Sequence, residues 1–82
     1  MKYFARVEVS LKPGHSDPEG ETTKDILIDL NYKVEEVKVS KVYEMQIEAS
    51  SFRVARKQIE EMCRRLLSNP VKDNYLIQIE EA

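Results

Sequence analysis

Hydrophobic and polar residues alternate over residues 2–12, with small or apolar side chains at the odd positions Tyr3, Ala5, Val7, Val9 and Leu11. This period of two predicts a half-buried β-strand. Alternation returns over residues 34–49 and near the C-terminal end, where three residues are expected inward: Tyr75, Ile77 and Ile79. No turn signal marks Ser40 and Lys41, so the 34–49 stretch predicts two strands or one long strand that bends there.

Two stretches between these segments show the spacing of amphipathic helices. The first helix is expected over residues 18–30, with Asp17 as N-cap, Pro18 at the first helical position and Asn31 as a left-handed stop. The second is expected over residues 52–68, after a serine cap. Its apolar stripe comprises Phe52, Ala55, Ile59, Met62, Cys63, Leu66 and Leu67.

The resulting order, β-α-β-β-α-β, predicts an α+β fold of the ferredoxin-like split βαβ type. We expect a four-stranded antiparallel sheet in the order 4-1-3-2, with both helices on one face. A chain of 82 residues fits a single domain, residues 1–82. No apolar run reaches the roughly 20 residues of a membrane span, so a cytoplasmic protein is expected.

Charge and cysteine content narrow the function classes. The chain carries 13 basic and 15 acidic side chains, so its net charge of −2 disfavours nucleic acid and membrane partners. Phe4 is the sole aromatic residue expected on the open sheet face, whereas RNA-recognition modules stack bases on several rings. A single cysteine excludes an intrachain disulfide. A domain this small buries little surface, which favours association.

Candidate catalytic groups are sparse. His15 lacks a second histidine or cysteine to share a metal, and is interpreted as a solvated loop residue. Cys63 lies late in a helix on the apolar stripe, which favours a buried side chain over a nucleophile. Gly14 and Gly20 do not have phosphate-loop spacing. We therefore expect no catalytic residue, cofactor site or metal site in this chain.

Two association surfaces stay open at this level. The outward residues Phe4, Val42 and Leu76 form either an apolar patch or scattered exposed side chains. Residues 34–40 would form an edge strand, and pairing with a second copy there would extend the sheet. The charges around this segment could equally keep the edge unpaired: Lys33, Glu35, Glu36 and Lys38.

Several stretches resemble the PurS family, the small subunit of phosphoribosylformylglycinamidine synthase. They are Leu11-Lys12-Pro13-Gly14, Asp17-Pro18-Glu19-Gly20, Leu30-Asn31-Tyr32, Val37-Lys38-Val39-Ser40-Lys41, and residues 62–71 leading to Tyr75. The resemblance spans nearly the whole chain. His15, Ser40 and the Lys72-Asp73-Asn74 stretch depart from the family pattern.

This resemblance implies a non-catalytic assembly subunit in purine biosynthesis. Such a subunit forms homodimers, bridges the synthetase subunit PurL and the glutaminase subunit PurQ, and supports ammonia transfer between them. ATP, magnesium and glutamine are then expected on the partner subunits and no cofactor on this chain. The alternative is an ACT-like dimeric module that senses a small metabolite.

Physical roles follow for the matched residues, which either dock a partner or only shape turns: Pro13, Gly14, Asp17, Pro18, Gly20, Lys41, Asn69, Pro70 and Tyr75. We hypothesise that the loops over residues 13–20 and 69–75 present a docking surface. Gly20 is costly in the first turn of a helix, so it indicates close approach by another element or chain.

Overall fold

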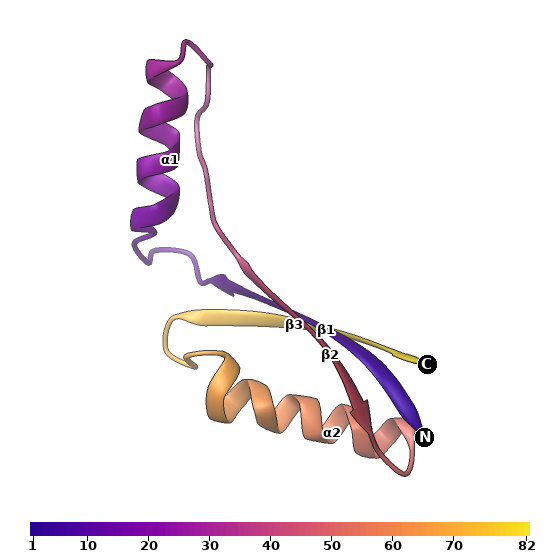
Figure 1. The fold of residues 1–82 in the computed structure, drawn as a ribbon. Coiled ribbons are helices and arrows are strands. Elements are labelled where there is room, and N and C mark those ends of the chain that lie inside the picture. The colour runs from indigo at the N-terminus through magenta and orange to yellow at the C-terminus, as the bar shows by residue number, and fades with distance from the viewer.

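Three antiparallel strands form one sheet in the computed structural model, which describes all of residues 1–82: β1 (Lys2–Leu11), β2 (Lys41–Glu48) and β3 (Asp73–Glu81) (Figure 1). The order is β2-β1-β3, and Val7 at the centre lies opposite Tyr43 on one side and Ile77 on the other. Counted along the chain, these are the third, first and fourth of the four predicted strands. The two predicted neighbours of β1 in the sheet are therefore confirmed. The second predicted strand, over residues 34–40, is absent from the single chain, so the sheet has three strands instead of four.

Local sequence signals determine where the helices begin and end. Asp17 caps α1 (Pro18–Asp29) by accepting a hydrogen bond from the Gly20 amide, with Oδ1 at 2.9 Å. Asn31, with φ 72°, ends the helix in the left-handed conformation. Ser51 caps α2 (Phe52–Met62) through its Oγ, 3.2 Å from the Val54 amide. The sequence predicted each of these caps and stops.

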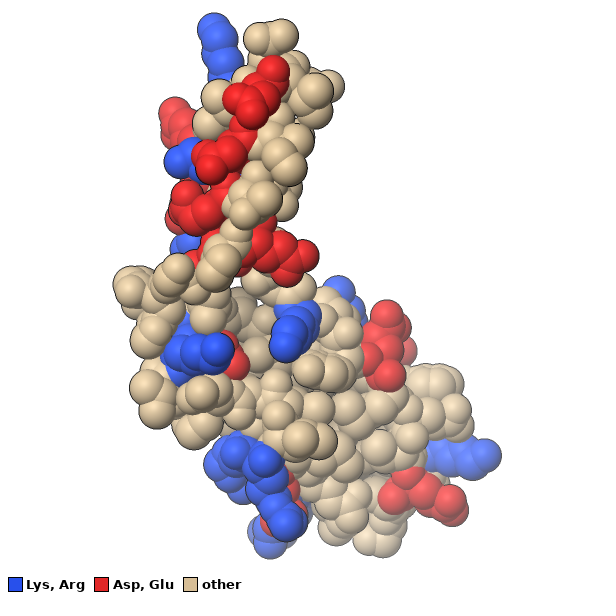
Figure 2. Space-filling view, turned by 60° about the vertical axis from the view of Figure 1, so that its left-hand side comes forward, with Lys and Arg blue, Asp and Glu red and all other residues tan.

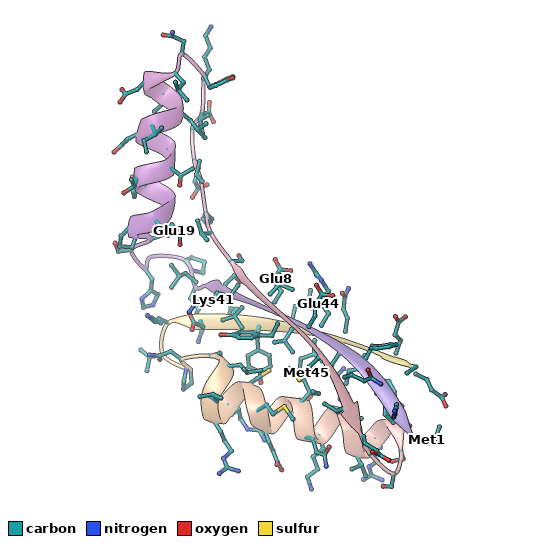
Figure 3. The ribbon with its side chains drawn as sticks, in the orientation of Figure 1. Met1, Glu8, Glu19, Lys41, Glu44 and Met45 are labelled. Carbon is teal, nitrogen blue, oxygen red and sulfur yellow. The ribbon has the colours of Figure 1, made fainter.

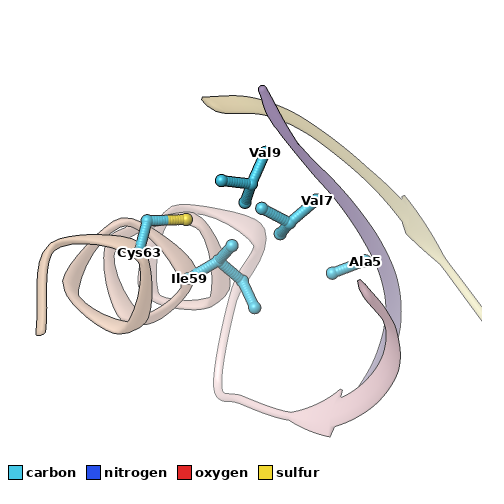
Figure 4. Close-up of a cluster of buried hydrophobic side chains, with 5 residues drawn as sticks. All are labelled: Ala5, Val7, Val9, Ile59 and Cys63. Atoms are coloured by element: carbon cyan, nitrogen blue, oxygen red, sulfur yellow. The ribbon is translucent and has the colours of Figure 1, made fainter. Parts of the chain in front are cut away.

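The hydrophobic core lies between the centre of the sheet and α2. Its main cluster joins one face of β1 to the inner face of the second helix, and consists of Ala5, Val7, Val9, Ile59 and Cys63 (Figure 4). Side chains of β2 and β3 pack around this cluster while remaining partly exposed. A smaller cluster of Tyr3, Ala49 and Ala55 extends it toward the start of α2.

A π-helical turn, η1 (Cys63–Leu67), continues α2 and changes the predicted apolar stripe. The Ser68 amide donates to the Cys63 carbonyl oxygen at 3.0 Å, five residues back instead of four. The wider turn keeps Leu67 against the core, whereas Leu66 is 83% exposed. The prediction that Leu66 belongs to the core stripe is therefore wrong.

The first helix does not cover the sheet. It projects beyond one end of the sheet, and residues 34–40 return alongside it, which gives the chain extents of 52 × 26 × 14 Å (Figure 1). We call residues 18–40 the arm. The prediction of both helices on one face is thus wrong for the single chain. Neither alternative for residues 34–49 is met in full: no hairpin forms, and only Lys41–Glu48 is a strand, into which the arm leads directly.

Candidate functional site

The two loops proposed as a docking surface do lie together. Lys12, at the end of β1, connects them: its amide donates to the Lys72 carbonyl oxygen at 2.7 Å and its Nζ to that of Pro70 at 3.0 Å. The chain just before the 13–20 loop is therefore hydrogen-bonded to the 69–75 connection. The prediction that these distant segments share one surface is consistent with this geometry.

The connection after the π-helical turn is stiffened by its own hydrogen bonds. Asn69 donates its amide to Asp73 Oδ2 at 2.8 Å, and its Oδ1 accepts from the Val71 amide at 2.9 Å. Its carbonyl oxygen also accepts from the Asp73 amide at 2.8 Å. Pro70 follows directly, where a helix cannot continue. Asn69 and Pro70 thus shape a tight turn that aims the chain into β3.

A hollow of about 370 Å³ lies between the base of the arm and the end of η1. Its apolar lining is Val9, Leu11, Val39 and Leu67, and its charged rim includes Asp17, Glu19, Lys41, Lys72 and Asp73. Figure 3 shows Glu19 and Lys41 at this junction of arm and sheet. Of the predicted site residues, Asp17, Pro18 and Lys41 line this hollow. An apolar floor with a rim of both charges is suited to protein contacts.

Asp17 joins the two segments of the arm, α1 and residues 34–40, at its base. While Oδ1 caps the helix, Oδ2 accepts a hydrogen bond from the Val39 amide at 2.8 Å. These hydrogen bonds lower the pKa of the carboxyl because they favour its charged form. The bond from the Val39 amide has the larger effect and the bond from the Gly20 amide the smaller one. Both carboxylate oxygens are thus occupied within the chain.

Gly20 is buried at the same contact. A Cβ at this position would overlap the carbonyl oxygen of Val37, so only glycine lets the helix approach residues 34–40 this closely. The expected close approach is therefore made by this chain's own backbone. Gly20 shapes the arm and is a poor probe of partner docking.

The remaining predicted residues lie outside this hollow. Pro13, Gly14 and His15 line a second hollow of about 330 Å³, which shares Asp17 and Val39 with the first. Gly14 has φ 87°, which explains a glycine there. Tyr75 lies on β3 opposite Val9 and is more than one-third exposed.

The open sheet face is polar between its apolar residues. Glu8 of β1 lies between Val42 and Leu76, while Phe4 lies two rows away. Figure 3 shows Glu8 and Glu44 on this face and Met45 on the side of α2. The three apolar residues are therefore scattered exposed side chains and not a contiguous patch.

Cys63 is buried in the core, where desolvation raises the pKa of its thiol, with Glu60 adding to the effect. The interpretation as a buried side chain is confirmed. Histidine, cysteine, aspartate and glutamate side chains form no group of three or more that could hold a metal ion. No helix has the length and apolar character that a membrane crossing requires.

Sequence reasoning did not predict that the backbone of residues 33–40 lacks hydrogen bonds to other backbone groups. Residues 33–40 make no backbone-to-backbone hydrogen bond, although the pattern over residues 34–49 predicts a strand. The missing turn signal near Ser40 left a hairpin and one long strand open, and neither alternative predicted an unpaired segment over residues 34–40.

Comparison with known proteins places this geometry in a family. The family model PurS, described as phosphoribosylformylglycinamidine (FGAM) synthase, matches residues 4–81. Phosphoribosylformylglycinamidine synthase subunit PurS of Archaeoglobus fulgidus is 46% identical over 90% of this chain and 94% of its own length.

Solved structures also match this chain over almost its whole length. The crystal structure of Methanocaldococcus jannaschii PurS, one of the subunits of formylglycinamide ribonucleotide amidotransferase in the purine biosynthetic pathway, matches with a TM-score of 0.84. It is 36% identical, and the match covers 98% of each chain. A chain in the structure of PurLQS from Thermotoga maritima matches with a TM-score of 0.87 over 98% of this chain and 99% of that one. Its identity of 23% shows the shared fold alone.

Proposed function

This chain belongs to the PurS family, and from that membership we propose that it is the small, non-catalytic assembly subunit of phosphoribosylformylglycinamidine synthase. The observation that carries the proposal is the family match over residues 4–81, together with 46% identity to the Archaeoglobus subunit. The synthase is a glutamine-dependent ligase of purine biosynthesis. An ACT-like metabolite sensor is not favoured, because the PurS match covers almost the whole chain.

The partners in this proposal are a synthetase subunit, PurL, and a glutaminase subunit, PurQ. The chain bridges them and supports ammonia transfer, and the PurLQS structure from Thermotoga, which contains a chain of the same fold, supports this choice. ATP, magnesium and glutamine then bind to the partner subunits. A phosphate does not fit the start of α1 in this chain, because Asp17 already binds the Gly20 amide there.

The proposal includes a homodimer. Three apolar or aromatic side chains of the arm, Ile26, Leu30 and Tyr32, are 55–60% exposed. An arm that leaves such groups in water is poorly stabilised by its own chain, and association removes this surface. We expect light scattering to give twice the mass of the 9.6 kDa chain or a higher multiple.

Reconstitution tests the assembly function. Purified synthetase and glutaminase subunits are assayed for glutamine-dependent product formation, with and without the chain. We expect the chain to raise this rate and to leave the rate with free ammonia, which needs no glutaminase, nearly unchanged. Equal glutamine-dependent rates in both mixtures would contradict the assembly function.

The hollow at the base of the arm is the docking surface in this proposal, and the synthetase subunit is its occupant. Lys72 lies on its rim and is exposed, so Lys72→Glu reverses a charge without disturbing the core. We expect this variant to co-elute less with the synthetase subunit. The matched control is Lys57→Glu on the exposed side of α2. Equal retention of both variants would show that docking uses another surface.

A further inference from the structure

The outer edge of β3 carries backbone groups that nothing in this chain binds. This strand lies at one side of the sheet, so only its side toward β1 is paired. Near the start of β3, the Lys12 amide donates to the Lys72 carbonyl oxygen at 2.7 Å. Beyond its end, the Ala82 amide donates to the Lys2 carbonyl oxygen at 3.0 Å.

These two hydrogen bonds define which residues of β3 face outward. Both involve even-numbered residues of the C-terminal segment, and residues of an antiparallel pair alternate between the two sides of a strand. The odd-numbered residues therefore point their N–H and C=O groups away from β1. Those with both groups free are Tyr75, Ile77, Ile79 and Glu81, since no hydrogen bond outside the sheet reaches them.

Nothing in the sequence of this edge prevents another strand from adding to it. Proteins usually protect an exposed edge with proline, charge, a bulge or a short strand. The strand β3 has 9 residues, and its register with β1 runs without a bulge. Its central run, residues 75–79, contains no charge and no proline. The other edge strand, β2, has Glu44 near its centre, so the edge of β3 is the less protected of the two.

The core-facing side chains of β3 are incompletely covered at this edge. Ile77 is partly exposed, although Val7, its neighbour on β1, is fully buried. Ile79 is likewise partly exposed beside the buried Ala5. Both isoleucines line a hollow of about 950 Å³, together with Phe52 of α2. Apolar side chains of an added strand would extend this face and remove the isoleucines from water.

We infer that the outer edge of β3 binds an extended segment of the synthetase subunit, which adds to the sheet as a further strand. The inference rests on the proposed function, in which that subunit occupies the hollow at the base of the arm. Lys72 and Asp73 lie on the rim of that hollow, and β3 begins at Asp73. A segment that leaves the hollow along β3 stays in contact with both surfaces. Main-chain hydrogen bonds then supply affinity, and alternate side chains supply specificity.

The charges at the ends of β3 disfavour a second copy of this chain as the occupant. Asp73 begins the strand, and Glu80 and Glu81 end it. Antiparallel pairing about a two-fold axis through Ile77 would place Asp73 opposite Glu81 at both ends. Parallel pairing in register would align the same acids with one another. Like charges directly opposite each other destabilise a strand pair.

The same charges define the chemistry of the segment that does fit. It alternates apolar and polar residues, so that its apolar face covers Ile77 and Ile79, and it carries lysine or arginine near each end. The net charge of this chain is −2, and its acidic side chains gather along the arm (Figure 2). A segment with basic ends is therefore attracted by the arm as well as by the ends of β3.

Amide hydrogen exchange tests the inference on the wild-type chain, alone and with the purified synthetase subunit, read at single residues by fragmentation mass spectrometry. We expect the synthetase subunit to slow exchange at the amides of Tyr75, Ile77 and Ile79 by at least about tenfold. The amides of Leu76 and Gln78, which β1 binds in both samples, are the internal control and should change far less.

Three results of this experiment would overturn the inference. The first is unchanged exchange at the odd-numbered amides when the synthetase subunit is bound. The second is protection of these amides in the chain alone, which would make a second copy the occupant. The third is protection by the glutaminase subunit without the synthetase subunit.

A pair of variants at Tyr75 separates the backbone from the side chain. Tyr75→Pro removes an outward amide that has no partner in this chain, and proline is tolerated on edge strands at such positions. Tyr75→Val also removes the ring but keeps the amide. We expect the proline variant to bind the synthetase subunit about tenfold more weakly than the valine variant, with equal circular dichroism. Equal affinities of the two folded variants would overturn the inference.

The proposed function has its own readout in the glutamine-dependent assay of the wild-type chain. A chain that raises this rate while its odd-numbered amides stay unprotected would leave the assembly function in place and remove the added strand. If the proline variant does not fold, the exchange experiment on the wild-type chain decides alone.

Discussion

Replacement of Ile59 by valine tests whether the core and the π-helical turn are placed correctly. Ile59 is 0% exposed and belongs to the cluster with Val7 and Val9 of β1. Removing one buried methylene costs about 1 kcal/mol, the transfer free energy and the small cavity together. A domain of this size has a free energy of unfolding of about 4–12 kcal/mol, so the loss is measurable.

The assay is thermal unfolding followed by circular dichroism at one fixed protein concentration. For a domain of this length, about 1 kcal/mol lowers the midpoint by about 4–8 °C. The matched control is Leu66→Ala in the same helical region, where Leu66 is 83% exposed. Exposed substitutions change stability by at most about 0.5 kcal/mol, so a shift below about 4 °C is expected.

The comparison would refute the reasoning if Leu66→Ala lowered the midpoint as much as Ile59→Val. A regular α-helix continued through residues 63–68 would turn Leu66 toward the core, and that result would indicate such a helix. A negligible shift for Ile59→Val would instead show that the packing between α2 and β1 is loose.

Two further predictions concern titratable groups. The pKa of Asp17 is lowered in the folded chain, so its contribution to stability is present above the unfolded pKa of about 3.9 and is lost as pH falls through the lower folded value. The protection factor of the Val39 amide, which corrects for the slower intrinsic exchange in acid, should therefore fall in the wild type as pH drops below about 3.9 but not in Asp17→Asn, and an identical pH profile would contradict the contact. Burial raises the pKa of the Cys63 thiol, so a thiol reagent at pH 8 should react at least about a hundredfold more slowly with native than with denatured chain. Equal rates would show that the core opens readily.

Local patterns predicted much of the fold because the interactions that fix it are local. Asp17, Asn31 and Ser51 act on backbone groups within a few residues, so their sequence context is sufficient. The alternation in β1 likewise placed Ala5, Val7 and Val9 in the core.

Features that depend on contacts between residues far apart in the sequence could not be predicted from local patterns. The spacing of Ile26 and Leu30 shows that α1 needs an apolar partner, but it does not say whether that partner is its own sheet or another chain. The π-helical turn inserts one residue into a regular stripe, and apolar periodicity over Leu66 and Leu67 does not reveal such an insertion. The hydrogen bond from Lys12 to the 69–75 connection depends on how β1 and β3 pair, which the loops do not encode.

The main cluster of the core is built from β1, α2 and η1, and no residue of the arm belongs to it. Two copies that associated only through their arms would therefore separate while each kept that cluster intact. Differently tagged copies should then form mixed dimers faster than either unfolds.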